Sequence, residues 1–167
     1  ARRLATVDAV VAHNVDCAVL PAGVASCYAM RTALAANAYA LADSSRTLAL
    51  DELREQQRAA SIRITAAAGI GVPQRFFEML AGAGLRIQPL ALPDHHDYAD
   101  DTFTGLDADV VLITEKDAVK CERIAALRQD SRVWVVPLLA RIDSALVDRV
   151  AAALDRLNKE PHGPTPV

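Results

Sequence analysis

The alternation of extended apolar segments with helical ones from residue 61 onward is the feature that most constrains the fold. Apolar runs typical of strands occupy four segments, 62–70, 85–92, 109–114 and 132–138. Helical patterns begin at Pro73, follow Thr114 and form a final stripe of Val147, Val150, Leu154 and Leu157, and a short helical segment also fits near residues 98–105. Strands that alternate with helices pair in parallel and carry the helices on the faces of the sheet. The sequence therefore predicts an α/β fold with a largely parallel sheet and flanking helices.

The residues before this alternation are less regular. A β-branched run at 7–12 predicts a strand, and residues 51–58 predict a short polar helix. The Ala-rich segment 33–41 fits either a helix or a strand by periodicity alone. We expect residues 61–158 to form one α/β domain and the Pro-rich residues 159–167 to be a disordered tail. The chain starts without Met, which predicts a cut at the front, and the tail predicts a natural C-terminus.

Charge and cysteine content bear on the class of protein. The net charge of -3 gives no electrostatic support for a nucleic-acid partner. No apolar run is long enough to predict a helix that spans a bilayer. The three cysteines, Cys17, Cys27 and Cys121, form no C-x-x-C pair and are odd in number. We therefore expect three free thiols in a reducing compartment and no zinc site.

Three loops follow the predicted strands, and ligands of open α/β sheets gather beyond the carboxyl ends of strands. The first loop contains Gly69 and Gly71 and leads into the helix at Pro73. Backbone N–H groups at such a helix start suit a phosphate, although a plain tight turn is the alternative. The chain contains no G-x-x-x-x-G-K-[ST] string. It therefore cannot by itself hold a triphosphate in the P-loop manner.

The second loop, LPDHHDY at 92–98, packs two imidazoles and two carboxylates into seven residues. An Asp or His can accept a hydroxyl proton, and a carboxylate beside an imidazole can fix its tautomer. Adjacent side chains rarely aim at one point, so we expect one of His95 and His96 to act in chemistry. A solvated loop whose His and Asp bind backbone groups is the alternative. Metal ligation is a lesser alternative, through His95, His96, Asp97 and Asp100.

The third loop opens the helix that follows Thr114. Lys116 could reach a phosphate, with Glu115 and Asp117 opposing it. The alternative is a helix start whose acidic residues complement the helix dipole. Thr114 and Asp117, three residues apart, form a start that resembles a capping box. Lys120 and Arg123 are expected on a solvated outer face of this helix.

Five strings, in this order and at these spacings, resemble the C-terminal half of the tetraacyldisaccharide 4'-kinase family, the lipid A 4'-kinases of Gram-negative bacteria. The strings are VDAVV near the start, AAAGIGVPQRFFEML, LPDHHDY, LITEKDAVKC and WVVPL. The resemblance implies a P-loop kinase-like fold whose Walker-type loop and catalytic aspartate lie in an N-terminal half outside this chain. Residues 1–60 would then be the end of that N-terminal kinase domain with a connecting segment, and a strand is implied at 38–41.

The resemblance also implies a reaction. Family members transfer the γ-phosphoryl group of ATP, with Mg²⁺, to the 4'-hydroxyl of tetraacyldisaccharide 1-phosphate and give lipid IVA. They act as peripheral proteins at the cytoplasmic face of the bacterial inner membrane. This chain alone is expected to be inactive, because ATP and Mg²⁺ would be bound mainly by the N-terminal half.

Site residues follow from the same resemblance. His95 matches the histidine that partners the catalytic aspartate, and Asp94 lies next to it. Five further residues are candidates for the substrate or nucleotide cleft: Gly69, Gly71, His96, Lys116 and Asp117. No metal ligand is assigned to this chain.

Two other readings stay open. The Asp-His-His string is also similar to that of the DHH phosphoesterases, which are metal-dependent hydrolases with further aspartates on other strands. The nearest such pair, Asp107 and Asp109, precedes its strand and would lie at the wrong end of the sheet. The second reading is a non-catalytic α/β binding domain, which is favoured only if the three loops do not converge.

Overall fold

The computed structural model describes residues 6–20, 26–94 and 96–159. The chain forms two compact units, one of residues 33–139 and one of residues 1–32 with 140–167. The boundary expected after residue 60 does not coincide with this division, because residues 33–60 belong to the same compact unit as the strands that follow. The predicted tail lies outside the described residues from residue 160 onward.

The larger unit is built on a six-stranded sheet with the order β4-β3-β8-β7-β5-β6. Its strands are β3 (Asn37–Ala40), β4 (Asp43–Ala49), β5 (Ile64–Ala68), β6 (Ile87–Ala91), β7 (Val110–Thr114) and β8 (Val133–Val136). Strands β6, β5, β7 and β8 run parallel to one another, whereas β3 is antiparallel to β4 and β8. A short turn joins β3 to β4, and so short a connection can join only antiparallel strands. The predicted α/β fold is confirmed, but its sheet is mixed.

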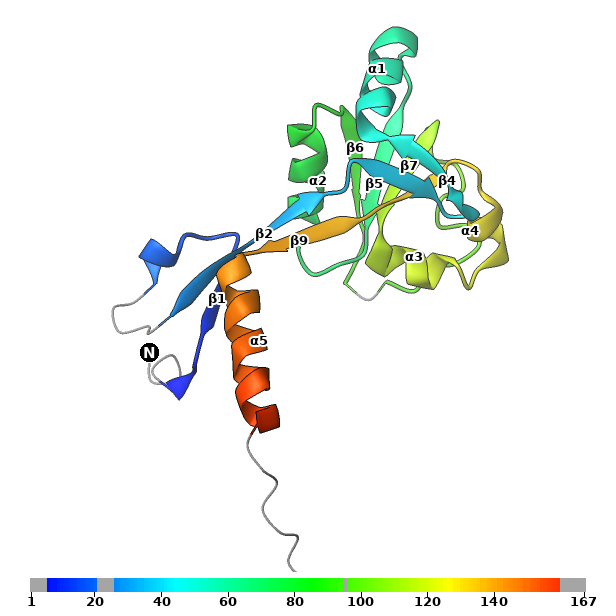
Figure 1. Ribbon diagram of the computed structural model, residues 1–167. Coiled ribbons are helices and arrows are strands. Elements are labelled where there is room, and N and C mark those ends of the chain that lie inside the picture. The colour runs from blue at the N-terminus through cyan, green and yellow to red at the C-terminus, as the bar shows by residue number, and fades with distance from the viewer. Residues whose placement is uncertain (1–5, 21–25, 95, 160–167) are drawn as a thin grey trace, which may run out of the picture. The chain divides into compact units, whose positions relative to one another are not determined.

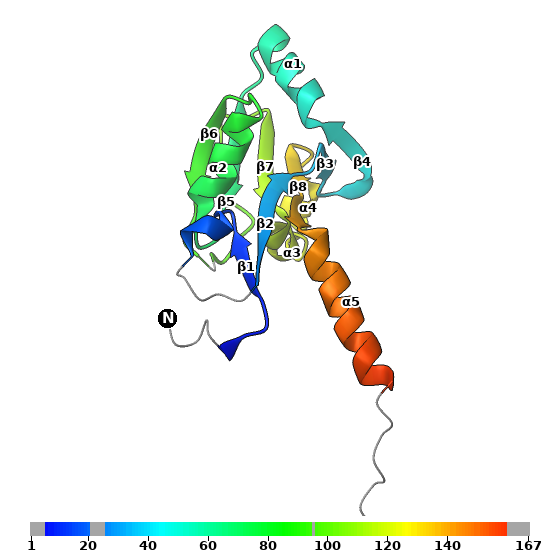
Figure 2. The same ribbon diagram turned by 60° about the vertical axis from the view of Figure 1, so that its left-hand side comes forward.

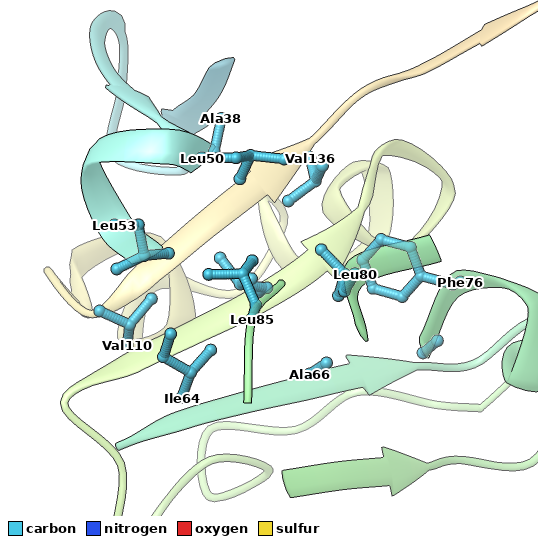
Figure 3. Close-up of a cluster of buried hydrophobic side chains, with 12 residues drawn as sticks. Ala38, Leu50, Leu53, Ile64, Ala66, Phe76, Leu80, Leu85, Val110 and Val136 are labelled. Atoms are coloured by element: carbon cyan, nitrogen blue, oxygen red, sulfur yellow. The ribbon is translucent and has the colours of Figure 1, made fainter. Parts of the chain in front are cut away.

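Helices cover both faces of this sheet (Figure 1, Figure 2). The helices are α1 (Leu50–Ala60), α2 (Pro73–Gly82), α3 (Glu115–Cys121) and α4 (Ala125–Gln129). Neighbouring residues of a strand point to opposite faces. Ala66 of β5 therefore shares a core with Leu53 of α1 and Leu80 of α2, as Figure 3 shows. Ala67 instead joins a second core with Ala118 of α3. All five residues of β5 are buried, as its wholly apolar end predicts.

The local signals that start helices act as predicted. Pro73 lies in the first turn of α2, where its missing N–H costs no hydrogen bond. The Thr114 hydroxyl caps α3 by accepting the Asp117 N–H at 3.3 Å. Between β6 and β7 the described residues form turns and no helix, so the helical segment expected near 98–105 is absent there. The chain crosses from β6 to β7 through a loop that carries the DHH string.

The smaller unit contains a three-stranded sheet and the last helix. The sheet has the order β1-β2-β9, formed by β1 (Val10–His13), β2 (Cys27–Leu34) and β9 (Leu138–Ile142). Helix α5 (Ser144–Lys159) contacts the N-terminal part of this unit through Arg149. The Arg149 side chain donates to the Asp8 carbonyl at 2.9 Å and to the Ser26 hydroxyl at 3.2 Å. The described residues leave the predicted apolar stripe of α5 exposed at Val147, Val150, Leu154 and Leu157.

The cysteines correct one expectation. Cys17 and Cys27 form a disulfide with Cα atoms 5.8 Å apart, and Cys121 is free and buried. The prediction of three free thiols is therefore wrong for two of them. An odd number of cysteines leaves one thiol over but does not prevent one pair from forming. Burial raises the pKa of the Cys121 thiol to about 12, so it stays protonated at neutral pH.

Candidate functional site

The carboxyl ends of β6, β5 and β7 lie side by side, because the three strands are parallel neighbours in the sheet. The loops after β5 and β6 and the start of α3 leave the sheet at this edge. The Leu92 N–H donates to the Ala68 carbonyl at 3.0 Å and joins the first two loops where they begin. The predicted convergence of three loops is confirmed. This counts against the reading as a non-catalytic binding domain.

The outer layer of the site brings Asp94, Lys116 and Gly71 together. Lys116 Nζ lies 3.8 Å from Asp94 Oδ1, and the two side chains are 56% and 47% exposed. A Cβ atom on Gly71 would lie 3.7 Å from Asp94 Oδ2, so this glycine passes close to the same carboxylate. An exposed ion pair of this kind contributes at most about 1 kcal/mol. Little therefore holds Lys116 back from an incoming anion.

The inner layer is organised by Asp117, whose side chain is fully buried. One carboxylate oxygen accepts the Gly69 N–H at 3.1 Å, and the other accepts the Thr114 hydroxyl at 2.7 Å. Asp117 therefore fastens the turn after β5 to the start of α3. Asp117 is expected from the sequence, with Glu115, to oppose Lys116. Its carboxylate instead binds Gly69 and Thr114, and the carboxylate that lies 3.8 Å from Lys116 Nζ is that of Asp94.

Tyr98 packs beside this buried carboxylate, a position that we do not predict from the sequence. Its side chain is buried, and a Cβ atom on Gly69 would lie 3.3 Å from its hydroxyl. Its ring meets the His96 ring edge-on, with centroids 5.0 Å apart. Burial above all, and then the Asp117 carboxylate, raise the pKa of Tyr98 far above its usual range, so the phenol stays protonated. The one sequence feature that could have predicted this position is that Tyr98 is the aromatic residue at the end of the string LPDHHDY.

Of the two adjacent histidines, the structure describes only His96. His95 lies outside the described residues, so its catalytic role stays a prediction. The His96 N–H donates to the Pro93 carbonyl at 3.0 Å and closes a turn of the loop. Its half-buried ring contacts Tyr98, which gives His96 a packing role.

Lys120 departs from the expectation of a solvated outer helix face. Its amine donates to the His96 carbonyl at 3.3 Å and lies 5.9 Å from the centre of the Tyr98 ring. Arg123 is exposed, as expected for that face. Both line a cavity of about 390 Å³ together with His96, Asp97, Tyr98 and Ile124. The loop after β6 is thus contacted from α3 at two points, Lys116 and Lys120.

Comparisons with known proteins identify the family. The model of the tetraacyldisaccharide-1-P 4'-kinase family, LpxK, matches residues 1–155. The chain belongs to this family. A tetraacyldisaccharide 4'-kinase of Janthinobacterium sp. (strain Marseille) is 49% identical over 114 residues, which are 68% of this chain and 33% of that protein. One of Herminiimonas arsenicoxydans is 54% identical over 92 residues, 55% of this chain and 26% of that protein.

The chain thus spans about a third or less of the length of these relatives. Among solved structures, the LpxK from Aquifex aeolicus, crystallised in complex with ATP, matches with a TM-score of 0.50. The match has 20% sequence identity and covers 76% of this chain and 36% of that one. At this identity the likeness shows a shared fold.

The aspartates that a DHH phosphoesterase would need lie at the opposite end of the sheet. Asp107 and Asp109 precede β7 and pair with Arg63, which precedes β5. The Asp109 carboxylate also accepts the Arg63 N–H at 2.8 Å, so these residues join the amino ends of the two strands. In the part of the chain that the structure describes, no group of three His, Cys, Asp or Glu side chains could hold a metal ion. The phosphoesterase reading gains no support from these residues.

Proposed function

We propose that this chain is the C-terminal part of an ATP-dependent kinase with a P-loop kinase-like fold. The kinase phosphorylates the 4'-hydroxyl of tetraacyldisaccharide 1-phosphate and gives lipid IVA, a step of lipid A biosynthesis. Family membership over residues 1–155 supports the reaction class. The observation that carries the proposal within the structure is the meeting of Asp94, Lys116 and Gly71 at the carboxyl ends of three parallel strands.

In this proposal the DHH string and Lys116 face the reacting groups. An aspartate in the rest of the protein accepts the proton of the sugar hydroxyl, and His95, supported by Asp94, acts as its partner. Lys116 is half exposed and only loosely paired, so it can turn from Asp94 to a phosphate oxygen. Phosphoryl transfer needs positioning and charge stabilisation more than covalent chemistry from the protein, and these residues supply both.

The remainder of the kinase would supply most contacts to ATP and Mg²⁺. This chain contains no P-loop string, and its described residues include no cluster that could hold a metal. The proposed partner is the lipid A precursor at the cytoplasmic face of the inner membrane, bound peripherally. A substrate with four acyl chains resides in a bilayer, because each buried CH₂ contributes about 0.8 kcal/mol. None of the helices in the described ranges is both long and apolar enough to cross that bilayer.

Substitution of the two histidines in the intact kinase tests the assignment. His95→Ala should lower kcat by about 10²–10⁴-fold, as expected for loss of a positioned acid–base group, with the KM for ATP and the melting temperature little changed. His96→Ala should lower kcat only a few-fold and should lower the melting temperature, because the His96 ring packs on Tyr98. Steady-state kinetics and melting curves distinguish the two. Equal losses of kcat would remove the case for His95.

The isolated chain provides a second test. Residues 1–167 alone should neither hydrolyse ATP nor phosphorylate the disaccharide, because the groups that bind the β- and γ-phosphates are proposed to lie elsewhere. Phosphate release by the purified chain, with and without Mg²⁺, measures this directly. Robust Mg²⁺-dependent turnover that persists through further purification would contradict the proposal that the rest of the kinase binds the β- and γ-phosphates.

A further inference from the structure

Helix α3 contacts both neighbouring loops of the site through residues on one side. Asp117 binds the Gly69 N–H in the loop after β5, at 3.1 Å. Lys120, three residues later, donates to the His96 carbonyl in the loop after β6, at 3.3 Å. Residues three apart on a helix lie on the same face. The helix therefore ties the two loops to one rigid element.

The contacts of Lys120 are unusual for a lysine near a helix end. The side chain is half-buried, and its amine also lies 5.9 Å from the centre of the buried Tyr98 ring. A hydrogen bond from a charged donor is stronger than one from a neutral donor, and the ring face adds a cation–π attraction. The His96 carbonyl belongs to the residue that directly follows His95 in the chain. The tether therefore acts one peptide away from the proposed catalytic histidine.

We propose that Lys120 is a positioning residue for phosphoryl transfer, which holds the DHH loop in its reactive place by binding the His96 carbonyl and the Tyr98 ring. This inference rests on the proposed function of the loop. Lys120 acts through the backbone and needs no contact with substrate. A misplacement of about 1 Å at a reacting group can cost roughly 100-fold in rate, so loss of the tether should lower kcat by roughly 10- to 100-fold.

Arg123 offers a matched control. It lines the same cavity as Lys120, His96 and Tyr98. Within the described residues its guanidinium has no hydrogen-bond or ion-pair partner. Removing its charge changes the cavity's charge by one unit and leaves the loop contacts in place. A comparison of the two positions thus separates a tether from a cavity that binds an anion by its charge.

The experiment uses the intact kinase and the variants Lys120→Met, Lys120→Arg and Arg123→Met. Lys120→Met should lower kcat roughly 10- to 100-fold with the KM for ATP changed less than about threefold. Lys120→Arg should recover most of the loss, since a guanidinium can also donate to a carbonyl and lie over a ring. Arg123→Met should retain wild-type kcat. Hydrogen exchange of residues 93–98 should quicken in Lys120→Met only.

Two results would overturn the inference. One is a Lys120→Met variant with wild-type kcat, and the other is an equal loss in Arg123→Met. If Lys120→Met melts too low for kinetics, two other results decide the matter. The tether requires that Lys120→Arg recovers most of the kcat and that hydrogen exchange of residues 93–98 quickens in the folded fraction of Lys120→Met. His95→Ala runs alongside as a reference. If it too keeps wild-type kcat, the proposed function of the loop fails, whereas a slow His95→Ala with a fast Lys120→Met rejects the tether alone.

Discussion

Gly69 and Gly71 are a matched pair for testing the packing of the site, because they share a loop and differ in their surroundings. A Cβ atom at Gly69 would lie 3.2 to 3.3 Å from three neighbours, which are Asp117 Oδ1, His96 Cβ and the Tyr98 hydroxyl. A Cβ atom at Gly71 would meet Asp94 Oδ2 at 3.7 Å, an ordinary van der Waals contact. Neither glycine has a positive φ, so both backbones accept alanine.

The expected magnitudes follow from these contacts. Replacing glycine by alanine restricts the unfolded chain and adds about 0.4–1 kcal/mol to the free energy of unfolding where the folded state has room. Gly71→Ala should therefore be neutral or slightly stabilising. Gly69→Ala gains the same amount but must push three neighbours outward, and overpacking of this kind costs about 1–3 kcal/mol. Because the unfolded-state effect is common to both, Gly69→Ala should be less stable than Gly71→Ala by about 1–3 kcal/mol.

Urea unfolding measures this difference. Trp134 is the single tryptophan of the chain and lies in β8 of the larger unit, so its fluorescence reports on the unit that contains both glycines. The two curves should have similar slopes and separate midpoints. Coincident midpoints would refute the close packing of the three loops around Gly69.

Two further predictions concern the thiols and one partly buried ion pair. Without reductant the denatured chain should show one reactive thiol, Cys121, and after reduction three, because Cys17 and Cys27 are paired; three thiols before reduction would show that the pair is open. The Arg132 guanidinium, by its hydrogen bond, holds the pKa of Asp130 below its usual range. Asp130→Asn should thus lower the free energy of unfolding by about 1–2 kcal/mol at neutral pH. This loss in the free energy of unfolding should fade as the pH falls from about 4 through the lowered folded-state pKa of Asp130, and a loss that does not shrink as the pH falls would contradict the ion pair.

The elements with purely local signals were predictable, and the ones defined by pairing were not. β5 and β7 are buried, mostly apolar runs that lie between parallel neighbours, and α2 begins at Pro73. β4 escaped prediction because most of its residues are exposed, which leaves no apolar alternation. The strand predicted at 132–138 divides at Pro137, which has no N–H to give to a ladder. The Pro137 carbonyl instead accepts the Ala35 N–H at 2.9 Å.

The edge of the sheet that carries the candidate site was predictable, but the roles of its residues were not. The rule that ligands gather at the carboxyl ends of parallel strands brought the three loops together. Which carboxylate faces Lys116 depends on the path of a loop that begins far away in the chain. Asp94 and Asp117 are both plausible partners in the sequence, and only packing assigns the exposed one to Lys116 and the buried one to Gly69. Periodicity likewise predicts the apolar stripe of α5 but not that its residues are exposed.

The string from Thr114 to Lys120, at the end of β7 and in α3, contacts both loops of the candidate site. Lys116 and Lys120 lie one turn apart and both reach the loop after β6, one at a side chain and one at a carbonyl. Asp117, between them, is turned inward to Gly69. Substitutions within one string should therefore differ in kind. Loss of the Lys116 charge should weaken phosphate binding, and loss of the Asp117 carboxylate should lower stability, because it leaves a buried N–H without an acceptor.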